Sequence, residues 1–497
     1  PPPPSDYPPQ DRVGAVRYRF LLESLADVDA SLRKLGSQLF VARGSPAEVI
    51  PSLVGEWGIT KLAFEKDSEP YAKARDAAIT KDMQAAGVAV VAATGHTLHD
   101  LREYGSKFSG GKPPATFAQF EKMFDKIGVP ELPTAAPSTL PPPSPAATEF
   151  AAAQPHGMAV PTMSEMGYEE AGEGDPAPLF IGGETEGLKR LDGHTARKAW
   201  IAAFEKPKTV PTTLEPSTTG LSPYMKFGCV SARRFWHAVA SISPVAKQTS
   251  LLGQLKWREF NYVVAAYTPN FDRMEGNPAC RQVPWDTSPE LLAAWREGRT
   301  GYPFIDAIQA QLRTQGWIHH LARHATACFL TRGDLWQSWE QGQRVFEHYL
   351  VDADWSINAF NWMWLSCSGF FYQYFRVYSP VAFGKKYDPE GVYVRRWCPA
   401  VARLPKKYVF EPWKAPVEVQ RQAGCVVGKD YPHPVVDHAE ASKANKGKMA
   451  EAYKRQAALG EELSGVAFVA EGSVFGGGDA PAAGAGAGVP SNKRRRV

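Results

Sequence analysis

The segment Trp317-Ile318-His319-His320-Leu321-Ala322-Arg323-His324 concentrates side chains that can transfer protons. Its apolar spacing predicts a helix with His320, Arg323 and His324 on one face. Imidazoles one turn apart can act as an acid and base pair near neutral pH, bind a metal, or pack as ordinary core residues. Zinc is disfavoured because a zincin helix requires the pattern His-Glu-x-x-His, and this segment has no Glu. We therefore predict no metal site.

A second group of polar side chains lies between residues 352 and 364, where apolar sequence surrounds two carboxylates. A buried carboxylate needs a partner, and Arg323 is a candidate partner for Asp352 or Asp354. Such a pair can also be purely structural. Eleven of the 14 Trp residues lie between residues 257 and 413. Because indoles pack, stack on nucleic-acid bases and carry single electrons, this concentration favours a functional site with a redox cofactor nearby.

The scaffold for these groups begins with an alternation of strands and helices. The strand candidates are 39–42 and 88–91, and the helix candidates include 18–35 and 71–86. Strands that alternate with helices indicate a parallel sheet. We therefore expect a Rossmann-like α/β domain over residues 1–133.

The rest of the chain divides into three parts. Residues 134–178 are rich in Pro, Ala, Ser and Gly, which predicts a surface linker with little structure of its own. Residues 179–428 are expected to be mostly helical, with Trp and Tyr in the core. Residues 429–497 predict an amphipathic basic helix near 441–459 and a Gly/Ala-rich tail that ends in Lys493-Arg494-Arg495-Arg496.

Composition restricts the class of protein. The chain has 497 residues, of which 44% are hydrophobic, so it is long enough for two domains with a large core. No apolar run is long enough to span a membrane, no signal peptide is recognisable, and the six Cys have no Cys-x-x-Cys spacing. These features favour a soluble intracellular protein with reduced thiols. A net charge of +4 allows a polyanionic partner and also fits many enzymes.

The histidine segment is one of five sequence blocks that resemble the cryptochrome and DNA photolyase family. The other four are 217–224, 254–260, 269–277 and 375–380. The blocks are most similar to the branch of 6-4 photolyases and animal-type cryptochromes, and the resemblance extends from about residue 180 to 416. It implies an N-terminal α/β domain joined by a long linker to an all-α, FAD-binding domain.

The start of the chain departs from the family pattern. Family members open with a buried strand and an Arg-rich motif, followed by a helix and a second strand, whereas this sequence opens with Pro1-Pro2-Pro3-Pro4-Ser5-Asp6-Tyr7. We therefore expect the α/β domain to lack its first strand-helix-strand unit, which would leave backbone groups unpaired and apolar helix faces uncovered. The resemblance implies an antenna chromophore of the deazaflavin or folate type in that domain, and this departure argues against it.

The resemblance also implies a U-shaped FAD in the helical domain. The residues that match the family's cofactor site are Thr218, Thr219, Leu221, Ser222, Arg258, Arg323, Asp352, Asp354 and Asn358. The first four would hold the phosphates in a hydroxyl-rich loop before a helix, although a simple N-cap and turn fits the same residues. Arg323 and Asp352 would pair over the flavin ring, with Asp354 near its edge and the ribityl chain. Asn358 would face flavin N5, where an amide can donate or accept a hydrogen bond.

Four indoles match the electron-transfer relay of the family: Trp362, Trp339, Trp285 and, as an outermost member, Trp336. Such a chain would let a photoexcited flavin draw an electron from the surface in short hops. Core packing is the better explanation for any single Trp. The relay interpretation depends on all four positions matching together.

DNA recognition is implied for Gln254 and Trp257. They stand at i and i+3 of one predicted helix, so a flipped base could stack on the indole while the amide reads its edge. Gln254 matches the 6-4 branch, whereas family members that repair cyclobutane dimers carry Glu at this position.

Lesion chemistry is implied for the histidine pair. His320 would be the general acid for a 6-4 photoproduct, with His324 holding it in place and tuning its pKa. Tyr378, Arg376 and Lys206 would contact the lesion or its phosphates. Each of these three residues could instead be an ordinary solvated or core side chain.

Together these expectations predict a blue-light-driven DNA repair enzyme. FADH⁻ would inject one electron into a 6-4 photoproduct flipped out of UV-damaged DNA, and the electron would return after bond cleavage. The alternative is an animal-type cryptochrome, a blue-light photoreceptor or clock protein that signals to partner proteins through its C-terminal helix and tail with little or no repair. The terminal basic run favours import into the nucleus.

Overall fold

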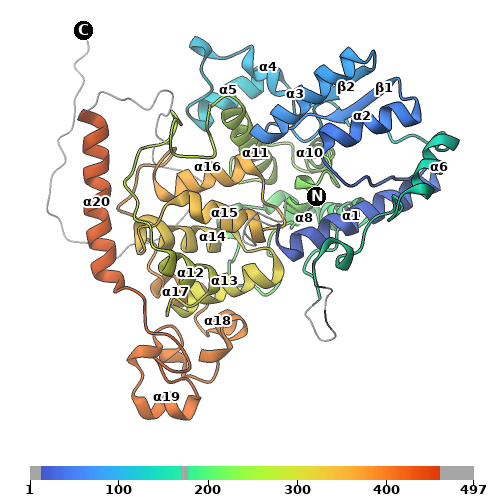
Figure 1. Cartoon of the computed structure of the whole chain (residues 1–497). Helices are drawn as coiled ribbons and strands as arrows, with labels where there is room; N and C mark the ends of the chain where they lie inside the picture. The colour runs from blue at the N-terminus through green and yellow to red at the C-terminus, as the bar shows by residue number, and fades with distance from the viewer. Residues whose placement is uncertain (1–12, 170–171, 173–176, 459–497) are drawn as a thin grey trace, which may run out of the picture.

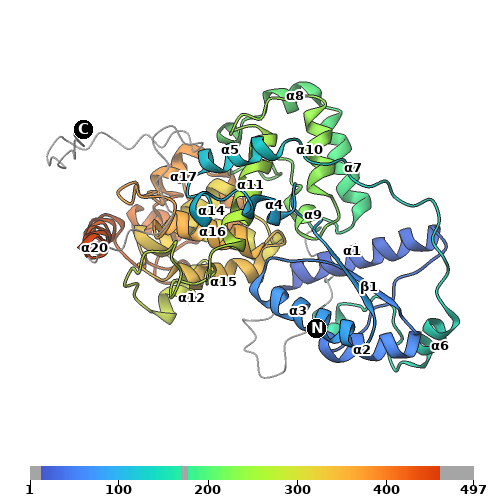
Figure 2. The same ribbon diagram turned by 90° about the horizontal axis from the view of Figure 1, so that it is seen from above.

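The computed structural model describes residues 13–169, 172 and 177–458. A small α/β region packs against a larger helical body, and the last helix, α20 (His438–Ala458), lies at the end of the molecule opposite the sheet in both views (Figures 1 and 2). This helix confirms the basic helix predicted near 441–459. The opening run Pro1 to Tyr7 and the terminal run Lys493 to Arg496 lie outside the described residues. Within the described ranges, no helix is both long and apolar enough to cross a membrane.

The α/β region contains two parallel strands, each preceded by a helix. Its elements are α1 (Ala15–Lys34), α2 (Pro46–Trp57), β1 (Lys61–Glu65), α3 (Pro70–Ala85) and β2 (Ala89–Ala93). In the strand register, Lys61 lies opposite Ala89 and Glu65 lies opposite Ala93. The predicted parallel sheet and both predicted helices are confirmed, and β2 overlaps the apolar run 88–91.

The strand predicted at 39–42 is wrong. This segment has no strand partner among the described residues, because β2 pairs with β1. The Val41 N–H instead donates to the Met158 carbonyl at 2.8 Å, which ties the segment to the chain that returns from the end of the α/β region. An apolar run indicates burial, but a strand also needs a neighbour in register, and residue spacing does not reveal that neighbour.

Three helices connect the sheet to the helical body: α4 (Leu101–Gly105), α5 (Phe117–Ile127) and α6 (Pro145–Ala153). The last of these lies inside the predicted linker, which therefore has more structure than expected. Ser144 caps α6 by accepting a first-turn N–H at 3.2 Å, and Pro145 occupies the first helical position. The Ser-Pro pair is a helix-start signal that the bulk composition of the segment concealed.

The helical body surrounds one continuous apolar core. Its longer helices are α7 (Glu184–Thr195), α10 (Ala232–Ala240), α11 (Leu251–Ala266), α12 (Pro289–Glu297), α13 (Pro303–Gln315), α15 (Trp339–Tyr349) and α16 (Trp355–Ser366). The shorter ones are α8 (Lys198–Ala203), α9 (Ser222–Lys226), α17 (Ala382–Tyr387), α18 (Val392–Trp397) and α19 (Val417–Ala423). Trp295, Trp339 and Trp362 are among the largest fully buried side chains. The predicted helical region with Trp in its core is confirmed, and the three boundaries between the four predicted segments stay predictions.

The histidine helix, α14 (His320–Cys328), begins three residues later than predicted. His319 caps it, because its Nδ1 accepts the Leu321 N–H at 3.2 Å. The helix continues into a π-helical turn at Phe329–Gly333, and the chain then reaches Trp336, whose φ is 56°. A bulky residue in this left-handed region is strained, so its surroundings must hold it there.

Candidate functional site

A cavity in the helical body is lined by residues of α9, α11, α14 and α16 and of the loops around them. It brings together most of the side chains singled out in the sequence: Lys206, Thr218, Thr219, Leu221, Ser222, Gln254, Trp257, Arg258, His320, Arg323, His324, Asp352, Asp354, Asn358 and Trp362. Five others do not line it: Trp285, Trp336, Trp339, Arg376 and Tyr378.

Arg323 and Asp352 form an ion pair in the cavity wall. Arg323 Nη2 lies 2.8 Å from Asp352 Oδ2, and the Ser222 hydroxyl donates to the same oxygen at 2.7 Å. The Asp352 side chain is 5% exposed, so its charge depends on these partners. Of the two carboxylates considered as partners of Arg323, the structure selects Asp352.

The loop before α9 brings hydroxyls to the same wall. Thr218, Thr219 and Ser222 line the cavity, and Gly220 makes the turn between them with a φ of 61°. A Cβ at Gly220 would lie 3.0 Å from Phe180, so the turn favours glycine for both its backbone angle and its space. The helix that follows has only five residues, so the side-chain hydroxyls are the main polar groups of this loop.

Asp354 fixes the start of α16. Its Oδ1 accepts the backbone N–H groups of Ser356 at 3.1 Å and Ile357 at 3.2 Å, which caps the helix. Because α16 carries Asn358 and Trp362 into the cavity wall, this cap orients two predicted site residues at once.

The second oxygen of Asp354 accepts the hydroxyl of Tyr262 from α11. Burial would raise the pKa of Asp354, but the charges of Lys226 and Arg258 and the Tyr262 hydroxyl outweigh burial and hold the pKa below its usual value. The carboxylate is therefore ionised at neutral pH. Tyr262 was not predicted, because the sequence does not show that it faces Asp354.

The amide of Asn358 is held by α15. Its Nδ2 donates to the Gln343 carbonyl at 3.1 Å and to Glu347 Oε1 at 3.4 Å. With the donor end held in this way, Oδ1 is the end of the amide left for the cavity. An acceptor at this position suits an N–H group of a ligand.

The two histidines of α14 lie side by side. Their ring centroids are 5.9 Å apart, and the ring of His319 is 4.2 Å from that of His320. Tyr378 reaches the site through His324, because its hydroxyl lies 3.5 Å from His324 Nδ1. Arg376 is exposed and away from the cavity lining.

The surroundings of these rings disfavour protonation. Burial, followed by the charge of Lys206, lowers the pKa of His324 to about 3 and that of His320 well below its usual value. Burial also lowers the pKa of Lys206 to about 8. Both imidazoles are therefore neutral at pH 7 in the protein alone. His320 can act as an acid only when a negatively charged ligand raises its pKa.

Trp257 is already covered on one face. Its ring centroid lies 4.1 Å from that of Phe117 with an interplanar angle of 12°, and it meets Trp364 edge-on at 6.0 Å. A base could therefore stack only on the opposite face. Gln254 Nε2 donates to the Gln248 carbonyl at 2.7 Å, so the amide of Gln254 is also oriented. Phe117 belongs to α5, and no sequence signal connects it with Trp257.

Of the four predicted relay residues, two belong to the main core and two are in contact with each other beside α20. Trp362 lines the cavity at 1% exposure, and Trp339 is fully buried. Trp285 and Trp336 are in contact, with centroids 4.6 Å apart. Lys448 of α20 places its Nζ over the Trp336 ring at 4.9 Å. Helix α20 thus covers the second pair.

Some polar atoms of the cavity residues lack partners within the part of the chain that the structure describes. They are Trp257 Nε1, Asn261 Oδ1, Asp352 Oδ1 and Trp362 Nε1. Buried polar atoms are normally hydrogen-bonded, so this set suits a polar ligand. The hydroxyls, guanidinium groups and aromatic rings around the cavity suit the phosphates, sugar hydroxyls and flat ring of FAD. The residues present therefore fit this cofactor.

Family comparisons agree with the fold and the site. Residues 4–141 match the family model of DNA photolyase, and residues 251–451 match that of the FAD binding domain of DNA photolyase. The fold and the site therefore define a flavoprotein of the photolyase fold, with an N-terminal α/β domain and a C-terminal helical FAD-binding domain.

Comparison with individual relatives shows which members of the photolyase fold this chain is similar to. The chain is 50% identical to Cryptochrome-1 of Gallus gallus over 450 residues, which are 89% of this chain and 72% of that protein. It is also 50% identical to Cryptochrome-2 of Gallus gallus over 89% of this chain and 76% of that protein. A solved Synechocystis cryptochrome matches with a TM-score of 0.76 and 26% identity over 88% of each chain. The chain belongs to the cryptochrome/photolyase family, as its motifs predicted.

Proposed function

We propose that this protein is a cryptochrome-type blue-light photoreceptor that signals through α20 and the tail beyond it. The observation that carries the proposal is the placement of the indoles. Trp362 lines the cavity, while Trp336, which is in contact with Trp285, lies beneath Lys448 of α20. An electron relay between the cavity and α20 would connect the cofactor with the helix. The 50% identity to named cryptochromes supports the same function.

FAD, when bound, supplies light absorption and one-electron chemistry. The chain's own residues would hold and tune it: the hydroxyls of Thr218, Thr219 and Ser222 would bind phosphate oxygens. The Arg323–Asp352 pair would orient the flavin ring. Asn358 Oδ1 would accept a hydrogen bond from an N–H group at the edge of that ring. The indoles would supply the electron that reduces the flavin in the light.

Light-dependent reduction of the flavin in the purified full chain tests the relay. We expect Trp362→Phe to remove most of the reduction seen by absorbance, because it deletes the indole in the cavity wall. The control Trp397→Phe changes an indole of α18 outside the relay and should reduce normally. Equal reduction in Trp362→Phe and the unsubstituted chain would exclude the relay.

Signalling needs its own measurement, because a relay alone does not signal. Hydrogen exchange of α20 should become faster in blue light in the unsubstituted chain and should not respond in Trp362→Phe. Exchange that is the same in light and darkness would count against α20 as the signalling element.

A second function, repair of 6-4 photoproducts, is supported by His320, His324, Lys206 and Gln254, which all line the same cavity. The phosphates of UV-damaged DNA would supply the negative charge that raises the pKa of His320 and lets it act as an acid. Blue-light repair of an oligonucleotide with one 6-4 photoproduct, under reducing conditions, tests this function. Repair that is lost in His320→Ala would establish it, and no repair by the FAD-loaded chain would leave the photoreceptor function alone.

Nuclear import is also part of the proposal. Its support is the run Lys493 to Arg496, which lies outside the described residues. A fluorescent fusion in which these four residues are alanine should lose its nuclear accumulation. Unchanged accumulation would assign import to another part of the chain.

A further inference from the structure

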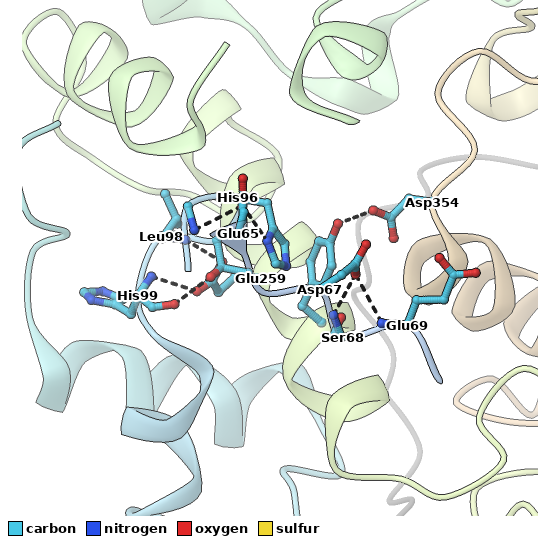
Figure 3. Close-up of polar contacts among 12 residues, drawn as sticks. Glu65, Asp67, Ser68, Glu69, His96, Leu98, His99, Glu259 and Asp354 are labelled. Atoms are coloured by element: carbon cyan, nitrogen blue, oxygen red, sulfur yellow. Dashed lines mark hydrogen bonds and ion pairs between the residues drawn. The ribbon is translucent and has the colours of Figure 1, made fainter. Parts of the chain in front are cut away.

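The loop that follows β2 is clamped to α11 beside the cavity. Glu259 accepts the N–H groups of Leu98 at 2.9 Å and His99 at 3.1 Å, and the Tyr104 hydroxyl at 3.1 Å. Figure 3 shows this carboxylate between the loop and the helix. Glu259 is fully buried, so the clamp is protected from water.

Arg258, one residue earlier, makes a second connection. Its Nη1 donates to the His96 carbonyl at 2.5 Å, and its Nη2 donates to the Tyr262 hydroxyl at 3.3 Å. The guanidinium carbon also lies 4.7 Å from the centroid of the Tyr262 ring. Arg258 lines the cavity, yet these donors point to the loop and to Tyr262.

Tyr262 joins the loop to the cavity. Its ring centroid is 4.9 Å from that of His96, and His96 Nδ1 lies 2.9 Å from Glu65 Oε1 at the end of β1. Its hydroxyl donates to Asp354 Oδ2, the dashed contact of Asp354 in Figure 3. The side chain is 3% exposed. A continuous set of contacts therefore runs from the carboxyl end of the sheet to the cavity.

We infer that Tyr262 is a positioning residue for the FAD site, through which loop 95–99 of the α/β domain holds Asp354 in the orientation that the cofactor needs. Oδ1 of Asp354 already caps α16. The hydrogen bond from Tyr262 to Oδ2 therefore fixes how the carboxylate is oriented toward a ligand. The α/β domain thereby contributes to flavin affinity through Asp354. The inference rests on FAD as the ligand and is independent of the choice between signalling and repair.

Removal of the hydroxyl should weaken FAD binding in a pH-dependent way. Tyr262→Phe deletes the hydrogen bond to Asp354 and the one from Arg258, and loss of a hydrogen bond to a charged group corresponds to an at least roughly tenfold higher Kd. Without the Tyr262 hydrogen bond, less opposes the effect of burial, so the pKa of Asp354 should be higher in the variant than in the unsubstituted chain, although Lys226 and Arg258 still lower it. The carboxylate of the variant then gains a proton at a higher pH, so the loss of affinity should grow as the pH falls. The unsubstituted chain should lose affinity only at a lower pH.

The experiment is a titration of the full chain with FAD in the dark, followed by flavin fluorescence at each pH. Tyr393→Phe is the matched control, because it removes a buried hydroxyl that donates to Gln311 Oε1 at 2.7 Å outside the cavity lining. A pH-dependent loss in Tyr262→Phe alone supports the inference. Unchanged affinity, or an equal and pH-independent loss in both variants, overturns it.

A second variant keeps the test valid if Tyr262→Phe folds poorly by circular dichroism. His96→Ala removes the ring packed on Tyr262 and its link to Glu65, and leaves the hydroxyl of Tyr262 in place. We expect a smaller loss of FAD affinity with the same pH dependence, and no change would also overturn the inference. Failure of the unsubstituted chain to bind FAD would instead show that the cofactor assignment is wrong.

Discussion

The three neighbouring imidazoles of His319, His320 and His324 make the stability of this protein depend on pH. Burial first, and the charge of Lys206 second, lower the pKa of His319 and of His324 to about 3. A histidine in the unfolded chain titrates near pH ~6.5, so below that pH the unfolded chain binds more protons than the folded one. The stability that depends on neutral imidazoles is therefore fully present above pH ~6.5 and is lost as the pH falls toward about 3.

His324→Gln removes one of these titrating groups. We expect the free energy of unfolding to fall less steeply with decreasing pH, by up to about 1.4 kcal/mol per pH unit between pH ~6 and ~4. Urea unfolding at several pH values measures this slope. The exposed His156→Gln is the control and should keep the slope of the unsubstituted chain. An identical slope in His324→Gln would mean that His324 is not held neutral.

Gly342 makes room for the relay indole in the cavity wall. A Cβ at this position would lie 2.2 Å from Trp362 Cη2, so Gly342→Ala must displace the indole or the helix. We expect a loss of about 1–3 kcal/mol in the free energy of unfolding and slower light-dependent flavin reduction. The control is Gly447→Ala in α20, where an added Cβ has no neighbour within 4 Å. That variant should gain about 0.5–1 kcal/mol by helix propensity.

At the scale of elements, α20 is attached to the helical body along its length. At its start, His438 Nδ1 lies 2.6 Å from Asp334 Oδ1. In the middle, Lys448 Nζ lies 3.1 Å from Asp286 Oδ2, and near its end the Tyr453 hydroxyl donates to the Cys367 carbonyl at 2.8 Å. Burial raises the pKa of Asp334 to about 6, although His438 opposes this shift.

His438→Ala should loosen the start of α20 in a pH-dependent way. Without its partner the Asp334 carboxyl stays protonated to a higher pH, so the folded state loses stability as the pH rises through this raised pKa. We expect a small effect at pH ~5 and a loss of about 1–3 kcal/mol at pH ~8, where the buried charge is unpaired. Hydrogen exchange of the first turns of α20 measures the change. Equal protection at both pH values would mean that the pair does not hold the helix.

The interior of the cavity was the most predictable element-scale feature, because its residues come from short motifs at element ends. The face shared by His320, Arg323 and His324 follows from helical spacing, and the structure places all three in the wall. The strand at 39–42 was wrongly predicted and the helix α6 was missed, for opposite reasons. The segment 39–42 is apolar but has no neighbouring strand among the described residues, so its apolarity suggested a strand that does not form. The N-cap of α6 lies inside a segment of biased composition, and that composition suggested a linker.

At the scale of the whole molecule, the α/β domain and the helical body meet at the Glu259 clamp. Glu259→Gln supplies one acceptor instead of two and turns an amide N–H toward backbone donors. We expect a loss of about 1–3 kcal/mol in the free energy of unfolding and faster proteolysis at loop 95–99. Glu65→Gln, in a half-exposed contact with the same loop, should change stability by at most about 0.5 kcal/mol. Equal effects of the two substitutions would contradict the clamp.

The sequence by itself determined the class of this protein and the content of its site. Helical periodicity, N-caps and the family-like blocks act over a few residues, so they can be read from the chain directly. They were sufficient to predict a parallel α/β domain, a helical FAD-binding domain and most of the charged side chains that line the cavity.

Only the tertiary structure decided which of these side chains meet. In the structure, Arg323 pairs with Asp352, and Asp354 accepts a hydrogen bond from Tyr262. Phe117 of α5 stacks on Trp257. These contacts join segments far apart in the chain, and their choice depends on the packing of whole elements around a common core. Local spacing carries no information about such packing, because the same helix can present its face to many different neighbours.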